Sequence, residues 1–395
     1  MLSNGIKRTA FCFCFIIFLL VSAVCMASEA ADLTAQCRIT VTENPDKRRN
    51  MLNSDMKRSW NGGERGEILV TTPKGQKAQG VQVGLYGHDT ALIALNAEGT
   101  VIARTKDAFR VQYLAFSEPC GSFTIRRADG SEPFQVAFLQ VVGEGPLPRW
   151  VQRWEKPDRD IDLMLISTHP DDEILWFGGL LPTYAGELKK KVLVVYMVGG
   201  QTPHRVLELL DGLWTMGVTL YPDIGSLKDT RKATIPSTLL VWGRDTAARR
   251  VTEAIRRYRP KVVVTQDVRG EYGHPHHVIT VEAVMDVAAG KTADPEIFPE
   301  SAKEYGVWQA HKVYIHLYKK GAIRMDWRKP LSAFGGQTGI EVARAAFKKH
   351  RSQQGRYRVR DEGQYDSSLF GLYYTDVGED IQGKDLFEHI PENET

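Results

Sequence analysis

Two clusters of histidines and carboxylates carry the chemistry that this sequence could perform. The first cluster, His169-Pro170-Asp171-Asp172-Glu173, directly follows the apolar run Leu163–Ser167. The second, Tyr272-Gly273-His274-Pro275-His276-His277, comes much later in the chain. An apolar run that ends in polar side chains predicts a buried strand, and catalytic groups of α/β sheets gather at the carboxyl ends of strands. The sequence therefore predicts a cleft that receives these side chains.

Histidine nitrogens and carboxylate oxygens predict a metal site. A catalytic zinc ion keeps three protein ligands and one open position for water. His169 and Asp172 stand three residues apart across a strand-to-helix turn, so both can face one ion. His277 can supply a third ligand from beyond the strand predicted at Lys261–Gln266. Zinc lowers the pKa of its bound water to about 7, and Asp171 is the candidate base that takes the proton. These residues predict a metal-dependent hydrolase with one zinc ion per chain.

The same clusters resemble the motifs of a known enzyme family. His169-Pro170-Asp171-Asp172-Glu173, followed by Gly178-Gly179, resembles the first motif of the PIG-L/LmbE-like zinc-dependent de-N-acetylases. The stretch from Tyr272 to His277 resembles their second motif, a His-Pro-x-His element. The resemblance covers roughly residues 162–353, and it implies a zinc-dependent hydrolase that cleaves the amide bond of N-acetylated amino sugars.

The resemblance also implies a role for each motif residue. His169, Asp172 and His277 are then the zinc ligands, with His277 favoured over its neighbour His276 by motif position. Asp171 is the implied general base. The remaining implied roles are those of His274, which stabilises or protonates the tetrahedral intermediate, Tyr272, which hydrogen-bonds the oxyanion, and Arg205, which binds substrate.

Several of these residues have a plainer alternative. His276 stands where the family often has Asp, and a histidine cannot tune a neighbouring imidazole as an acid does. Asp171 and Asp172 could merely cap the following helix, because acids favour its N-terminal dipole. Glu173 is expected to be a structural first-turn residue, and Arg205 could be a solvated helix residue. We expect the histidines without motif context to be incidental: His88, His311, His316 and His389.

Length and composition predict a two-domain globular protein. The 395 residues exceed the usual size of one domain. The apolar content of 43% and the charged content of 25% are ordinary globular values. The formal net charge of +3 gives no reason to expect nucleic acid as a partner. We predict a signal peptide at 1–30, a β-sandwich domain at 31–142, a linker at 143–154 and a deacetylase domain at 155–395.

The N-terminus predicts export. Lys7 and Arg8 precede the apolar run Phe11–Val24, which has the length of a signal-peptide core. We therefore expect a secreted, periplasmic or cell-surface protein without a stable membrane span after cleavage, and an uncleaved anchor is the alternative. In an oxidising compartment, Cys37 and Cys120 predict one disulfide. Two buried free thiols are the alternative for this pair.

Short strand-like runs separated by turn residues fill the N-terminal part, at 39–42, 67–70, 80–86, 91–95, 123–125 and 134–142. This spacing predicts a β-sandwich or jelly roll. The order of Cys37, Leu52-Asn53-Ser54-Asp55, Trp60 and Glu67–Val70 resembles the discoidin or galactose-binding pattern. That resemblance implies a glycan-binding module, and a purely structural domain is the alternative.

After the Gly- and Pro-rich stretch Gly143–Pro148, strand-like runs alternate with helix-like ones. This alternation predicts a Rossmann-like α/β fold, with a parallel sheet and helices on both faces. A nucleotide-binding enzyme is disfavoured, because no G-x-G-x-x-G follows the first strand. The predicted strands are 163–167, 191–198, 261–266 and 312–318, and the predicted helices are 174–187, 203–216, 245–259, 276–289 and 339–350, with Thr202 as the cap of the second helix.

Two functions are compatible with the sequence. The first is a zinc-dependent de-N-acetylase that acts on N-acetylglucosamine-type amino sugars in a glycan or glycoconjugate. The second is a secreted glycan-binding protein whose catalytic domain is degenerate. The complete set of predicted zinc ligands favours the first function, and His276 is the feature that leaves room for the second.

Overall fold

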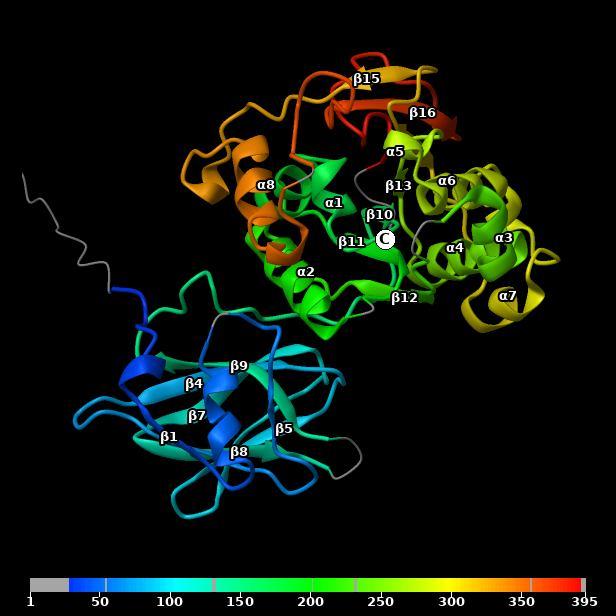
Figure 1. Cartoon of the computed structure of the whole chain (residues 1–395). Coiled ribbons are helices and arrows are strands. Elements are labelled where there is room, and N and C mark those ends of the chain that lie inside the picture. Colours follow the sequence, from blue (N-terminus) through cyan, green and yellow to red (C-terminus); the bar gives the residue numbers. More distant parts are fainter. Residues whose placement is uncertain are drawn as a thin grey trace, which may run out of the picture.

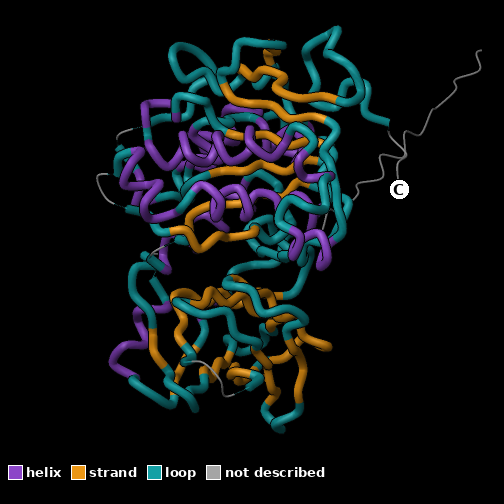
Figure 2. Tube along the Cα trace, turned by 90° about the vertical axis from the view of Figure 1, so that its right-hand side faces the viewer, coloured by secondary structure: helices purple, strands orange, loops and turns teal. Residues whose placement is uncertain are grey.

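The computed structural model describes residues 28–391, apart from 54, 130–132, 201, 231–232 and 356. Most of the predicted signal peptide, residues 1–27, therefore lies outside the described residues. Figure 1 shows a β-rich N-terminal part below a larger α/β part, and Figure 2 shows the same two parts from the side. Among the helices of the described residues, we find none with the length and apolar character that crossing a membrane requires.

The N-terminal part is a β-sandwich of two antiparallel sheets. Within the described residues, one sheet has the order β1-β3-β8-β5-β6 and the other β2-β9-β4-β7. Their facing side chains form one core that includes Trp60, Phe123 and Phe134. The strands are β1 (Arg38–Val41), β2 (Trp60–Asn61), β3 (Ile68–Thr71), β4 (Ala78–Leu85), β5 (Leu92–Asn96), β6 (Val101–Arg104), β7 (Val111–Cys120), β8 (Ser122–Arg127) and β9 (Gln135–Gly143).

The six predicted strands of this part are confirmed, and three further strands were missed. β2 has only two residues. β6 is exposed at both of its ends, and β7 becomes exposed in its second half, so neither has a sustained alternating pattern. Local hydrophobicity therefore gives these strands no signal, and their pairing with neighbours holds them in the sheets.

The predicted disulfide is wrong. Cys37 and Cys120 are both half-buried and both free. Cys37 lies just before β1 in one sheet, whereas Cys120 ends β7 in the other sheet. Burial, followed by the charge of Asp32, raises the pKa of the Cys37 thiol to about 11. The free-thiol alternative therefore describes this pair.

The α/β part is built on a seven-stranded sheet of order β12-β11-β10-β13-β14-β16-β15 in the described residues. The strands from β12 to β14 run parallel, and β16 pairs antiparallel with both β14 and β15. Every residue of β10, β11, β13 and β14 is buried, as expected for a sheet covered on both faces. The strands are β10 (Leu163–Ser167), β11 (Val192–Val198), β12 (Asp223–Leu227), β13 (Val262–Thr265), β14 (Lys312–His316), β15 (Ala322–Arg324) and β16 (Leu369–Thr375).

Helices cover both faces of this sheet (Figure 1). Helices α1, α2 and α8 share a core with one face, and α3, α4 and α6 share a core with the other. Four of the predicted helices are confirmed to within a few residues, as α2, α4, α6 and α8. The helices are α1 (Asp172–Leu175), α2 (Pro203–Thr215), α3 (Ile235–Trp242), α4 (Arg244–Tyr258), α5 (Gly270–Gly273), α6 (Pro275–Ala288), α7 (Pro299–Tyr305) and α8 (Gly339–Phe347).

The predicted helix 174–187 is broken. After α1 the chain turns at Gly178, which has a φ of +48°, and then forms a π-helical turn at Pro182–Glu187. A Cβ atom at Gly178 would lie 2.1 Å from the side-chain oxygen of Ser367, so only glycine fits this close approach. Thr202 is confirmed at the N-cap position of α2, although its side chain makes no capping hydrogen bond.

The order of the strands fixes where a ligand can bind. The chain runs from β10 outward to β11 and β12, and then returns to β13 on the other side of β10. A crevice opens at the carboxyl ends of strands where the order reverses in this way. The first cluster follows β10 and the second follows β13, so both lie at this crevice.

Candidate active site

Three ligand atoms of the predicted zinc site form a compact triangle. Nδ1 of His169 lies 3.0 Å from Oδ2 of Asp172 and 3.2 Å from Nε2 of His277. Nε2 of His277 lies 3.1 Å from the same oxygen of Asp172. Zinc–ligand bonds of about 2.0–2.2 Å would place one ion within reach of all three atoms. The three buried side chains therefore fit a single divalent ion.

Carboxylates and an indole hold two of these ligands in place. Nδ1 of His277 donates to Oε2 of Glu271 at 2.7 Å, which turns Nε2 toward the triangle. Nε1 of Trp176 donates to Oδ1 of Asp172 at 2.8 Å. Glu271 also contacts Nδ1 of His316 at 3.3 Å. The expectation that His316 is incidental is therefore wrong, since it contacts the partner of a candidate ligand.

The charges of the triangle favour a cation. Burial lowers the pKa of His277, but the carboxylates of Asp172 and Glu271 outweigh burial and raise it to about 10. Burial likewise opposes ionisation of Asp172, yet His277 and His169 hold the pKa of Asp172 well below its usual range. The two carboxylates thus stay ionised around this point and stabilise a positive charge between them.

Asp171 lies beside the triangle without belonging to it. Its backbone has a φ of +116°, and its side chain makes no capping hydrogen bond to α1, which argues against the capping alternative for this residue. Burial, followed by the charge of Asp172, raises the pKa of Asp171 to about 8, although Arg205 acts in the opposite direction. A base works best when its pKa lies near the working pH, so this carboxyl group suits proton transfer.

Arg205 reaches the same turn from the first turn of α2. Its Nη2 donates to the carbonyl oxygen of Pro170 at 2.6 Å and lies 3.6 Å from Oδ1 of Asp171. Its Nη1 lies 4.0 Å from Oδ2 of Asp229, on the loop after β12. Arg205 is therefore not a solvated helix residue, because its guanidinium group contacts the turn that carries the candidate base.

His274 and Tyr272 lie at the open side of the triangle. Nδ1 of His274 accepts the backbone N–H of His276 at 3.2 Å, so its neutral ring carries the proton on Nε2. Burial, followed by the neighbouring His277 and His169, lowers the pKa of His274 to about 3. The ring of Tyr272 is 37% exposed and its centroid lies 5.6 Å from that of His274. Both side chains can therefore face a substrate.

Glu173 does more than begin the helix. Its Oε2 accepts the backbone N–H of Asp171 at 2.8 Å, and its Oε1 lies 3.4 Å from Nε2 of His350. Both side chains are essentially buried. Burial lowers the pKa of His350, but the Glu173 carboxylate outweighs burial and raises it. This pair stabilises the positive-φ backbone of Asp171, and His350 comes from beyond α8, far along the chain from the first cluster.

Comparison with known proteins identifies the family. Residues 164–288 match the family model described as "PIG-L: GlcNAc-PI de-N-acetylase". A 1D-myo-inositol 2-acetamido-2-deoxy-alpha-D-glucopyranoside deacetylase of Streptomyces avermitilis is 31% identical over 220 residues, which are 47% of this chain and 72% of that protein. The chain therefore belongs to the PIG-L family.

A further relative and two solved structures are also similar to parts of this chain. A deacetylase of the same name from Streptomyces scabiei is 29% identical over 188 residues, 41% of this chain, and the chain spans only 57% of its length. Among solved structures, the zinc-inhibited form of teicoplanin deacetylase Orf2 matches 52% of this chain and 88% of its own, with 17% identity and a TM-score of 0.31. The galactose complex of the family 32 CBM from Clostridium perfringens NanJ matches 29% of this chain and 99% of its own, with 15% identity and a TM-score of 0.24.

Proposed function

We propose that this protein is a zinc-dependent de-N-acetylase that hydrolyses the acetamide of N-acetylated amino sugars in a glycan or glycoconjugate. The observation that carries the proposal is the triangle of His169, Asp172 and His277, with Asp171 beside it. Membership of the PIG-L family and similarity to bacterial 2-acetamido-2-deoxy-glucopyranoside deacetylases support an N-acetylglucosamine-type substrate.

In this proposal His169, Asp172 and His277 hold the zinc ion. When bound, the ion would act as a Lewis acid and would lower the pKa of the water that it binds to about 7. Asp171 takes the proton of the water that attacks the acetamide carbonyl. Removal of such a base costs about 10²–10⁴-fold in rate.

The groups on the open side act on the oxygen and on the leaving amine. The Nε2–H of His274 and the hydroxyl of Tyr272 can donate to the oxyanion, where fixed donors stabilise developing charge. Arg205 fixes the position of Asp171 from a distance of 3.6 Å and extends toward the substrate as a binding residue. The proton that Asp171 took from water then passes to the leaving amine, the C–N bond breaks, and acetate is released.

We further infer the domain organisation of this protein and its export from the cytoplasm. The reversal of strand order between β10 and β13 supports a Rossmann-like α/β domain at 155–395. The β-sandwich at 31–142, joined by a linker at 143–154, supports a glycan-binding or structural module beside it. The charged and apolar N-terminal residues support a signal peptide at 1–30 and export of the protein. These domain bounds and this location stay predictions.

An acetate-release screen over N-acetylated glycans tests the proposal. The full chain, loaded with zinc, should release acetate from N-acetylglucosamine oligomers or conjugates. A chelator should abolish the release, and added zinc should restore it. Acetate release that persists unchanged after removal of all bound metal would contradict a metal-dependent mechanism.

The alternative function is that of a glycan-binding protein with a degenerate catalytic domain. The specific observation in its favour is His276, which stands where the family motif often has Asp. The same screen separates the two functions, because glycan binding without any acetate release across the panel would support the alternative.

A further inference from the structure

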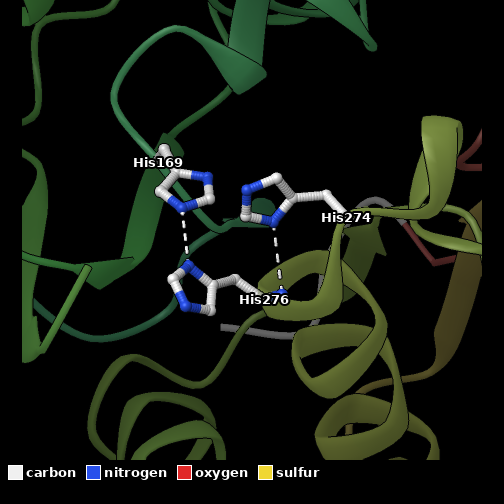
Figure 3. Close-up of side chains that lie close together, drawn as sticks. All are labelled: His169, His274 and His276. Carbon is white, nitrogen blue, oxygen red and sulfur yellow. Dashed lines mark hydrogen bonds between the residues drawn. The ribbon is translucent and has the colours of Figure 1, made fainter. Parts of the chain in front are cut away.

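The proposed role of His169 leaves one of its ring atoms to be explained. If Nδ1 of His169 serves as a ligand, the proton of the neutral ring must sit on Nε2. Nε2 lies 3.0 Å from Nδ1 of His276 (Figure 3). His276 is 0% exposed, and its other nitrogen has no hydrogen-bond partner among the described residues. When Nε2 of His169 donates, Nδ1 of His276 accepts, so the neutral ring of His276 carries its proton on Nε2.

Neighbouring residues fix the ring of His276 in this orientation. The ring stacks on Trp242, with centroids 4.7 Å apart and planes 23° apart. Nε1 of Trp242 donates to the carbonyl oxygen of Lys228 at 2.8 Å. The same indole thus contacts His276 and is hydrogen-bonded to the loop that carries Asp229.

Asp229 brings a carboxylate to this pair of histidines. Its Oδ1 lies 3.8 Å from Nε2 of His169 and 3.8 Å from Nδ1 of His276. It comes from the loop after β12, far in sequence from either histidine. A carboxylate that accepts from a metal-bound histidine raises the basicity of that ligand. In this protein the neutral imidazole of His276 accepts the hydrogen bond from His169, and the carboxylate of Asp229 lies slightly farther from the same nitrogen.

A second metal ion between His169, His274 and His276 explains this geometry less well than a hydrogen bond between His169 and His276 does. Their ring nitrogens do lie close enough to surround an ion. However, Nδ1 of His274 already accepts the backbone N–H of His276 (Figure 3). The neutral ring of His274 then has its proton on Nε2, so it presents a donor and no free lone pair.

We propose that His276 and Asp229 are positioning residues for His169. His276 accepts the Nε2–H and so holds the tautomer that directs the lone pair of Nδ1 to the zinc site. Asp229 adds the negative charge that a carboxylate at position 276 would otherwise supply. This inference rests on the proposed function, because it presupposes zinc at the triangle, and it concerns the affinity for zinc rather than the chemical step.

The test measures zinc affinity of the full chain by competition with a chromophoric chelator. His276→Leu removes the acceptor, and His276→Asn is its control, because asparagine is smaller than histidine but keeps an acceptor oxygen near the place of Nδ1. We expect His276→Leu to bind zinc about 10–100-fold more weakly than the wild type. His276→Asn should restore the affinity to within about threefold, and Asp229→Asn should weaken it about tenfold.

Controls separate this inference from folding and from the proposed function. Circular dichroism checks that each variant is folded, and Asp286→Asn, which removes an exposed carboxylate paired with Lys291, should bind zinc like the wild type. Wild-type affinity in folded His276→Leu would overturn the positioning role, while the proposed function would stand. Failure of the wild-type chain to bind zinc would overturn the proposed function and this inference together.

Discussion

Replacement of Asp171 by asparagine isolates proton transfer from metal binding. Asn has the shape of Asp, and it tolerates a positive φ better than most residues do, so the backbone at +116° can be kept. The backbone N–H at this position can still donate to Glu173. No atom of Asp171 belongs to the triangle of candidate ligands. The substitution therefore removes the base and leaves the zinc ligands intact.

The size of the expected loss follows from the usual contribution of a general base, which is about 10²–10⁴-fold. We therefore expect Asp171→Asn to lower kcat/KM by this factor, which corresponds to about 2.7–5.5 kcal/mol of transition-state stabilisation.

Acetate release by the zinc-loaded variant measures this loss, and metal analysis measures the zinc content. Asp286→Asn is the matched control, because it makes the same chemical change on an exposed helix position. Activity of Asp171→Asn within tenfold of the wild type, at full zinc content, would refute the role of Asp171 as the base. Loss of zinc from the variant would show instead that Asp171 is a ligand.

Three further predictions address other parts of the molecule. Glu271→Gln removes the negative charge beside Nδ1 of His277 while keeping an acceptor oxygen, and should weaken zinc binding about tenfold in a chelator competition; unchanged affinity would contradict a contribution of this charge to zinc binding. Cys37 should be free but slow to react with iodoacetamide at pH 8, because burial and a nearby carboxylate raise its pKa to about 11; intact mass after denaturation and alkylation would reveal a disulfide if one exists. Arg328, through its hydrogen bond and charge, lowers the pKa of Asp361, so the stabilisation is present above the unfolded-state pKa of about 4 and is lost as the pH falls through the folded-state value. Asp361→Asn should accordingly lower the free energy of unfolding by about 1 kcal/mol at pH 7 and by much less at pH 3, measured by urea unfolding, and an equal loss at both pH values would contradict this assignment.

The sequence by itself determined the elements that position the site. The buried strands β10, β11, β13 and β14 are continuous apolar runs, and such runs are recognisable without any tertiary information. Amphipathic helices such as α2 and α8 were found in the same way. The three candidate ligands also followed from residue type and spacing, because short motifs at the ends of strands meet at one edge of the sheet.

Elements without a local pattern could not be found in this way. β12 has no fully buried run, since only partly buried and exposed residues compose it. β16 pairs antiparallel with both β14 and β15, next to the edge of the sheet, and its second half is only half-buried. The helix predicted at 174–187 is interrupted at Gly178. The positive φ of this residue and its close approach to Ser367, far along the chain, both require glycine.

Only the tertiary structure decided how each side chain of the site is used. The choice of ring nitrogen in His169 depends on a hydrogen bond to His276 from the other cluster, and that in His277 depends on a hydrogen bond to Glu271. The contacts of Glu173 with His350, and of His169 with Asp229, join segments that have no common motif. Whether a hydrogen bond forms depends on the donor–acceptor distance to within a few tenths of an ångström and on the orientation of the ring. Residue types and spacing fix neither quantity, so the ligands were visible in the sequence and their supporting partners were not.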